Sequence, residues 1–246
     1  MTSTEKVLPA HSRFKAPLRI LFGSQFGLFF AGNGLSLVGT WMQRLACSWL
    51  IWDWTHSAFW LGILAAGDLL PVVVIGPFAG VVADRWNRLR LNMFAQVASA
   101  LLAVLTAVLL ATNHLGLISL VLLITAQGTL AAAIQPARLA MVQQMVPRED
   151  MSTAIALNSV NVNLARMLGP AAAGVMILHM DIVWVFVLNA TFTFLFVLIL
   201  ARLRLAPYLR RPRLSTFFGE MAEGFAYILR DQALWLIMLV MLFGGS

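Results

Sequence analysis

Long apolar segments recur along the whole chain and constrain its fold more than any other feature. Six of them approach or exceed the roughly 20 residues that an α-helix needs to cross the hydrocarbon core of a bilayer. Hydrophobic residues make up 61% of the chain and charged residues 11%, which is far more apolar than a soluble domain. The expected spans are approximately residues 19–53, 57–83, 91–112, 115–142, 152–179 and 182–201. The sequence therefore predicts an all-α, multi-pass membrane protein.

Basic residues are concentrated in alternate breaks between these segments. If the N-terminus is cytoplasmic, the loop Lys and Arg lie on the cytoplasmic side, and the three breaks on the outer side contain neither residue. Such a bias sets the orientation of membrane proteins. We therefore expect an N-in protein of a bacterial-type cell inner membrane. The net charge of +7 follows from this topology, and we expect no nucleic acid partner.

The composition divides the chain into four parts. Residues 1–18 are a polar, basic tail, which we expect to be cytoplasmic, and residues 19–203 form the six-helix bundle. Residues 204–232 are basic, contain prolines and include an amphipathic segment, as expected of a cytoplasmic linker. Residues 233–246 are apolar but too short to span a bilayer. We interpret them as the start of a truncated seventh transmembrane helix.

Three charged residues lie deep within the apolar segments, near the expected midplane, where each costs about 2.5–3.5 kcal/mol on insertion scales. They are Arg44, Asp68 and Arg166, and we expect that they can meet. Polar residues also recur every three or four positions in the first and fifth spans, so each helix has a polar face. From these observations the candidate cavity or coupling residues are Asn33, Thr40, Gln43, Arg44, Asp68, Asn163 and Arg166. A structural ion pair, or hydrogen bonds that only join helices, is the alternative.

The third and sixth spans differ from the others in their charge. They contain no charged residue between Asn92 and Ala111 or between Ile182 and Ala201. A span without charges can face hydrocarbon at low cost. We therefore expect these two helices to be the lipid-facing helices of the bundle.

No set of side chains suits catalysis or metal binding. His56, His114 and His179 lie at the outer ends of spans and have no further ligand or nucleophile beside them. The single cysteine, Cys47, excludes an intramolecular disulfide and a cysteine-based metal cluster. We therefore expect no enzyme activity, catalytic residue, metal or cofactor. An intramembrane lipid-modifying enzyme, which would need paired His, Asp or Ser groups facing one cavity, is a less favoured alternative.

A charged turn joins the second and third apolar segments. Residues 76–91 read Gly-Pro-Phe-Ala-Gly-Val-Val-Ala-Asp-Arg-Trp-Asn-Arg-Leu-Arg-Leu. Gly76 and Gly80 are four residues apart, so they share one face of a helix and let a neighbouring backbone come close. Asn87 tolerates a left-handed turn nearly as well as glycine.

This turn resembles the signature between the second and third helices of major facilitator superfamily transporters, with Asn87 in place of a glycine. Residues 169–174 resemble the Gly-Pro-x-x-Gly-Gly signature of exporters in that family. Residues 35–44 resemble the first helix of its siderophore-exporter and macrolide-efflux branch. The matching residues are Gly80, Asp84, Arg85, Arg88 and Arg90 in the turn, and Gly169, Pro170 and Gly174 in the fifth span.

The resemblance implies a transporter of two six-helix bundles, of which this chain supplies the first and the start of the second. It implies a small-molecule cavity between the bundles, lined here by the first, second, fourth and fifth spans, with Gln127 among the lining residues, and alternating access by rocking of the bundles. It also implies a conformational switch loop, in which Asp84 contacts the other bundle and Arg138 or the loop basic residues. Gly169, Pro170 and Gly174 would pack helices.

We expect the function to be proton-coupled efflux of amphiphilic small molecules, such as drugs or siderophores, by an antiporter. Many proton-coupled exporters of the family have an Arg at the position of Ile124. We therefore hypothesise that Asp68 is the coupling carboxylate of this half, with Arg166 as its favoured partner, against the alternative of a permanent ion pair. A fragment that transports nothing is the other alternative, which the continuation of the gene past Ser246 would decide.

Overall fold

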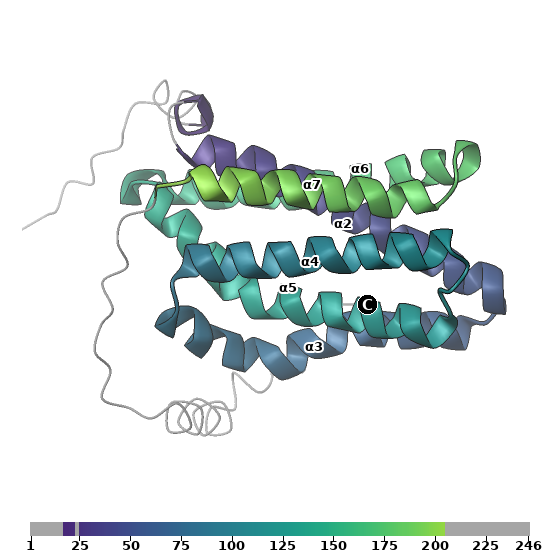
Figure 1. Ribbon diagram of the computed structural model, residues 1–246. Helices are drawn as coiled ribbons and strands as arrows, with labels where there is room; N and C mark the ends of the chain where they lie inside the picture. The colour runs from purple at the N-terminus through teal and green to yellow at the C-terminus, as the bar shows by residue number, and fades with distance from the viewer. Residues whose placement is uncertain (1–16, 23–24, 205–246) are drawn as a thin grey trace, which may run out of the picture. The chain divides into compact units, whose positions relative to one another are not determined.

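The computed structural model describes residues 17–22 and 25–204, without the side chains of residues 77, 78 and 81–85. Six long helices pack side by side in this part of the chain (Figure 1). They are α2 (Gln25–Thr55), α3 (Ala58–Arg85), α4 (Arg88–Ala111), α5 (Leu117–Met145), α6 (Met151–His179) and α7 (Val183–Arg202). A 3₁₀ turn, η1 (Arg148–Asp150), precedes α6, and these residues contain no strand. The predicted all-α bundle is confirmed, while the predicted linker and seventh helix lie outside the described residues.

The helices have the dimensions of membrane spans. Within the described residues, five segments are long and apolar enough to cross a bilayer, namely Ala58–Gly76, Arg88–Ala111, Leu117–Met145, Arg148–His179 and Val183–Arg202. α2 has 31 residues and is therefore about 46 Å long, which also suffices. It is not among these five because its polar face interrupts the hydrophobic sequence.

Helices that are distant in the sequence are close neighbours in the bundle. α3 packs along α5, α2 packs against α6 and α7, and α4 packs against α7 and α5. Exchanging α2 with α5, α3 with α6 and α4 with α7 leaves this pattern of neighbours unchanged. Because successive helices run in opposite directions, α2 and α5 begin at opposite ends of the bundle (Figure 1). The two groups of three helices therefore form an inverted repeat.

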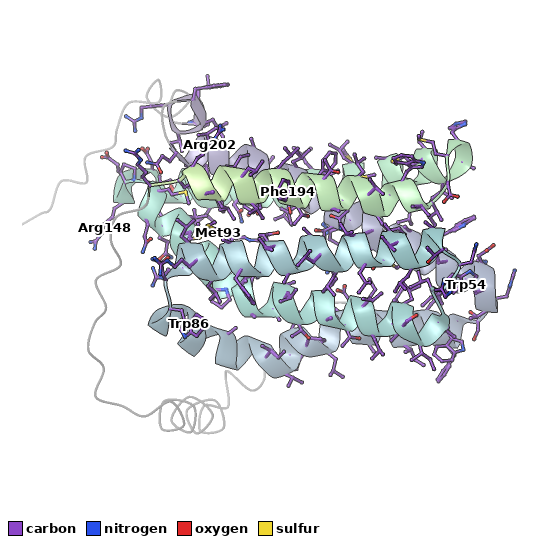
Figure 2. The ribbon with its side chains drawn as sticks, in the orientation of Figure 1. Trp54, Trp86, Met93, Arg148, Phe194 and Arg202 are labelled. Atoms are coloured by element: carbon purple, nitrogen blue, oxygen red, sulfur yellow. The ribbon has the colours of Figure 1, made fainter. Side chains whose placement is uncertain are left out.

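The two ends of the bundle differ in charge. Figure 2 shows Trp86, Arg148 and Arg202 at one end and Trp54 at the other. The first end, called the basic end below, also contains Arg88 and Arg90 at the start of α4. The turns at the opposite end, residues 56–57, 112–116 and 180–182, contain no Lys or Arg. The prediction of a cytoplasmic N-terminus was based on this same difference in Lys and Arg between the two ends.

α4 and α7, which the sequence predicted to be the lipid-facing helices, also have polar inner faces. Their outer faces are apolar, with Leu101 on α4 and Phe194 on α7 well exposed. Their inner faces, however, bury amide and hydroxyl side chains. These are Asn92, Gln96 and Thr106 on α4 and Asn189 and Thr193 on α7. The prediction considered charged residues alone and therefore did not include these neutral polar groups, which also join helices within a membrane.

The turn between α3 and α4 differs from the prediction in two details. Nothing lies within 4 Å of a Cβ added at Gly76 or Gly80, so among the described residues no neighbouring backbone approaches these glycines. Asn87 has a φ of −64° and is not left-handed. Its Oδ1 accepts hydrogen bonds from the backbone N–H groups of Leu89 and Arg90, at 3.0 and 3.1 Å. Asn87 therefore caps α4, which a glycine side chain cannot do.

Candidate functional site

A cavity of about 240 Å³ lies inside the bundle, and all six long helices contribute to its wall. α2 and α5 contribute most, each through residues spaced by three and four positions, because such residues share one face of a helix. Six of the predicted cavity residues line it. They are Asn33, Thr40, Gln43, Arg44, Asp68 and Gln127.

Two predicted cavity residues on α6 do not line this cavity. Asn163 and Arg166 are exposed on the outside of the described bundle, and the amide of Asn163 donates a hydrogen bond to the carbonyl oxygen of Ser159 at 2.8 Å. α6 instead packs through a buried stripe of small residues, which turns its polar stripe away. This stripe consists of Ala165, Gly169 and Ala173. The cavity wall receives Asn158 and Val162 from α6 instead.

Arg44 and Asp68 form an ion pair at the cavity wall, with 2.9 Å between Nη2 and Oδ2. Arg44 lies about three helical turns before the end of α2, and Asp68 lies about three turns after the start of α3. Both therefore lie about 15 Å from the turn that joins these antiparallel helices. Their side chains are 38% and 21% exposed, so the pair is accessible from the cavity. The partner of Asp68 is thus Arg44. The sequence had favoured Arg166.

Trp41 explains where Arg166 lies instead. The guanidinium carbon of Arg166 is 5.2 Å from the centre of the indole ring, and that of Arg44 is 4.7 Å from it. Both distances allow a cation–π interaction. Arg166 and Trp41 each lie roughly four helical turns before the end of their helix, α6 and α2 respectively. The two side chains are therefore at the same depth, roughly 20 Å from the end of the bundle opposite the basic end.

Two glycines bring these helices together. A Cβ at Gly128 of α5 would lie 2.7 Å from the backbone oxygen of Asp68, and one at Gly169 of α6 would lie 2.5 Å from the Cβ of Trp41. Both distances are too short for real carbon contacts, so glycine alone permits this packing. Gly174, by contrast, has nothing within 4 Å of an added Cβ. Pro170 lies within α6 directly after Gly169.

Arg138 also lines the cavity, although the sequence assigned it only to the switch loop. Its Nε is buried and has no hydrogen-bond partner. Arg138 follows Gln127 by about three helical turns, so the two share a face of α5. This spacing could have identified Arg138 from the sequence.

The predicted switch loop is described only in part. Arg88 is partly buried and Arg90 is exposed at the start of α4. The side chains of Asp84 and Arg85 lie outside the described residues. A contact between Asp84 and Arg138 therefore stays a prediction.

A buried hydrogen-bond network closes the cavity on the side of α7. Asn189 donates a hydrogen bond from its Nδ2 to Oε1 of Gln43. The hydroxyl of Thr193 donates to Oδ1 of Asn189 at 3.4 Å and lies 3.4 Å from the hydroxyl of Ser36. All four residues are buried and line the cavity. The network thus fixes α7 against α2 and gives the cavity a polar wall.

Membrane-length helices in an inverted repeat around a polar internal cavity are typical of the multi-pass class of membrane transport proteins. The sequence matches the transmembrane secretion effector family over residues 14–245. The chain belongs to this family, which is part of the major facilitator superfamily. Its fold is accordingly that of the superfamily's N-terminal six-helix bundle.

Several relatives are transporters. The chain is 28% identical to the staphyloferrin A transporter of Staphylococcus aureus, over 61% of this chain and 38% of that protein. It is 30% identical to the multidrug efflux pump Tap of Mycobacterium tuberculosis, over 71% of this chain and 41% of that protein. It is 26% identical to the macrolide efflux protein A of Streptococcus pyogenes, over 88% of this chain and 54% of that protein. The chain thus spans about half the length, or less, of these curated relatives. It belongs to a family of small-molecule transporters and is not an enzyme.

Proposed function

We propose that the protein exports amphiphilic small molecules by alternating access and that the internal cavity is this bundle's part of the path. The observation that carries the proposal is the accessible ion pair of Arg44 and Asp68 in a cavity with both polar and apolar walls. The volume of about 240 Å³ is below the roughly 300–1,000 Å³ of most ligand pockets. This supports a second bundle that completes the path. Relatives named as an efflux protein and an efflux pump support the direction.

The proposed orientation places the basic end in the cytoplasm, because Lys and Arg in short loops favour that side. Single cysteines at Ser57, Asn113 and Asn87 test it, in a protein whose native Cys47 is buried and therefore a weak competitor for labelling. A membrane-impermeant maleimide should label Ser57→Cys and Asn113→Cys from outside intact cells. Asn87→Cys should react only after the membrane is opened. The reverse pattern would show that the orientation is wrong.

We further propose Asp68 as the proton-coupling residue of this bundle. A carboxylate that forms a single ion pair at an accessible wall can exchange that partner for a proton if α2 and α3 move relative to each other. Arg44 is the group whose departure would leave Asp68 ready to bind a proton. The alternative is a permanent ion pair that holds α2 to α3.

Transport of dyes by the whole protein in proteoliposomes tests this function. The probes are cationic ethidium, neutral N-phenyl-1-naphthylamine and anionic 1-anilinonaphthalene-8-sulfonate. An imposed pH gradient should drive at least one dye, and transport of none would refute the export of amphiphiles. Asp68→Asn should abolish gradient-driven transport and keep exchange of dye across the membrane, whereas Asp53→Asn, an exposed control at the opposite end of α2, should keep both.

A structural role for the pair gives a different result. Asp68→Asn would then prevent folding or insertion, and addition of Arg44→Gln would restore the folded protein. That rescue, together with normal gradient-driven transport by the double variant, would refute coupling through Asp68.

A further inference from the structure

We propose that Arg138 binds an acidic group of the transported molecule, so that the substrates of this protein include amphiphilic acids. This inference rests on the proposed function and names a substrate class for the same cavity. It comes from three properties of the cavity wall, which are its charge balance, the unsatisfied groups around Arg138 and the apolar residues beside them.

The cavity has an excess positive charge. Arg44, Asp68 and Arg138 are its charged lining residues. Asp68 pairs with Arg44, and this pair has no net charge. Arg138 therefore leaves the cavity with a charge of +1. Among the described residues this charge has no carboxylate partner, so it attracts an anion more strongly than a neutral molecule of the same shape.

The guanidinium of the partly buried Arg138 has no partner for its Nε among the described residues. Its Nε is buried without a hydrogen bond, and no described carboxylate pairs with it. Arg138 lies about two helical turns before the end of α5, and Asn33 lies about two turns after the start of α2. Both therefore lie roughly 11 Å from the basic end. Asn33 is almost completely buried, and its Oδ1 also lacks a partner.

The guanidinium of Arg138 suits an acid. The planar guanidinium donates two parallel hydrogen bonds to a carboxylate or sulfonate, an arrangement stronger than a hydrogen bond between neutral groups. The unpaired Oδ1 of Asn33, at the same depth, is an acceptor and suits a hydroxyl or N–H group elsewhere in the same molecule. Ile134, Leu139 and Val142 line the wall near Arg138 in the same helix. An apolar body next to an acidic group matches this wall, and such a molecule is an amphiphilic acid.

Binding of two matched dyes tests the proposal without transport. 1-Anilinonaphthalene-8-sulfonate and N-phenyl-1-naphthylamine have the same ring system, and only the former has a sulfonate. The whole protein is purified into nanodiscs of zwitterionic lipid, which present no anionic headgroup to Arg138. Saturable dye fluorescence above that of empty nanodiscs gives each affinity. Trp41 is part of the cavity wall, so the part of the tryptophan-to-dye energy transfer that Trp41→Phe removes assigns the signal to this cavity.

Arg138→Gln should weaken binding of the sulfonate about tenfold or more, because a hydrogen bond to a charged group is lost, and should change binding of the neutral dye less than about twofold. Arg138→Lys should retain much of the preference for the sulfonate. Arg148→Gln is the matched control, since Arg148 is exposed at the basic end and does not line the cavity. It should change neither affinity.

Gln135→Glu provides a second variant that does not remove Arg138. Gln135 is exposed, lines the cavity and precedes Arg138 by one helical turn. A carboxylate there can pair with Arg138, and this isosteric change should also weaken sulfonate binding selectively. The proposal is wrong if neither Arg138→Gln nor Gln135→Glu lowers the sulfonate affinity. It is equally wrong if both dyes weaken in parallel, as loss of a conformational latch at Arg138 would cause.

The result separates this inference from the proposed function. Selective sulfonate binding through Arg138 in a protein that moves none of the dyes would refute export and leave the acid site standing. Export of dyes with affinities that do not depend on Arg138 would refute the acid site and leave export standing.

Discussion

The contact between Gly128 and Asp68 makes the position of the ion pair sensitive to a single methyl group. In Gly128→Ala, the added Cβ would lie 2.7 Å from the backbone oxygen of Asp68 and 3.2 Å from its Cα. Ordinary van der Waals contact begins at 3.4 Å. α3 must therefore move away from α5 by about 0.7 Å, because neither atom belongs to a flexible side chain.

This displacement has two calculable effects. Overpacking of this kind costs about 1–3 kcal/mol of stability, partly offset by up to about 1 kcal/mol from the higher helix propensity of alanine. The distance from Arg44 Nη2 to Asp68 Oδ2 is 2.9 Å. A movement of about 0.7 Å along that line lengthens it to about 3.6 Å, beyond hydrogen-bond range. We therefore expect Gly128→Ala to lose stability and to weaken the ion pair.

The loss of stability in Gly128→Ala is measured by unfolding in mixed detergent micelles, followed by circular dichroism. The weakening of the ion pair is measured by a double-mutant cycle with Arg44→Gln and Asp68→Asn, in the presence and absence of Gly128→Ala. The coupling energy should be about 0.5–1 kcal/mol for this partly exposed pair and should be smaller with Gly128→Ala. Gly62→Ala in α3 is the control, because nothing lies within 4 Å of its added Cβ. Equal stability of the Gly62→Ala and Gly128→Ala variants would refute the reasoning.

Two further predictions concern packing around the cavity. Gly169→Ala should destabilise the bundle by about 1–3 kcal/mol, because its Cβ meets Trp41, whereas Gly174→Ala should not; equal unfolding energies would contradict this. Asn189→Leu should cost about 1–3 kcal/mol because Oε1 of Gln43 loses its donor. The double variant Asn189→Leu/Gln43→Met should recover part of that loss in the same unfolding assay, and an additive loss would show that the hydrogen bond does not join the two side chains.

The depth of Arg44 and Asp68 in the bundle could be predicted from the sequence. The first polar break lies at residues 53–56, and Arg44 and Asp68 are at similar distances on either side of it. Antiparallel neighbours joined by a short turn must bring such positions to the same depth. The sequence therefore showed that these side chains could meet. The polar face of α2 was also visible, because polar residues recurred at helical spacing.

The rotation of α6 about its axis could not be predicted in this way. α6 has a polar stripe and a stripe of small residues, and either stripe could face a neighbour. In the structure the close approach at Gly169 turns the small residues towards α2. This leaves Arg166 on Trp41 instead of Asp68. Which stripe packs depends on the shape of the partner helix, and one helix's sequence does not contain that information.

The place of Arg138 in the cavity wall was missed for a different reason. A basic residue near the end of a span is normally explained by topology, since Lys and Arg gather on the cytoplasmic side. That rule predicts the end of the helix on which a cation lies but not the face. The face follows from its separation of about three turns from Gln127, which also lines the cavity. Helical spacing also applies to the neutral residues of α4 and α7. Gln96 and Ser99 share one face of α4, Asn189 and Thr193 share one face of α7, and all four line the wall.

Asp68 and Arg138 share one cavity, so protonation of Asp68 must affect the binding of an acid. Protonation, or the substitution Asp68→Asn, releases Arg44 and raises the net charge of the cavity from +1 to +2. Arg138 lies about three turns along α5 from Gly128, which contacts Asp68, and thus about 15 Å from that level. At an effective dielectric constant of about 20, one charge at this distance is worth roughly 1 kcal/mol, or about fivefold in affinity. We therefore expect Asp68→Asn to strengthen binding of 1-anilinonaphthalene-8-sulfonate by up to about fivefold and to leave N-phenyl-1-naphthylamine unchanged, in the nanodisc titration.

Because protonation of Asp68 strengthens the binding of an acid, it limits what can drive the export of that acid. By thermodynamic reciprocity, an anion that binds better to the protonated cavity also favours its protonation. Proton antiport requires the proton and the substrate to compete, and the charge balance of this cavity makes a cationic molecule compete with the proton but not an acid. Export of an anion can instead draw on an inside-negative membrane potential, worth about 2.3 kcal/mol per charge per 100 mV. Sulfonate efflux from proteoliposomes should therefore follow an imposed potential more closely than a pH gradient. Weaker sulfonate binding by Asp68→Asn, or efflux that follows the pH gradient alone, would contradict this account of the cavity.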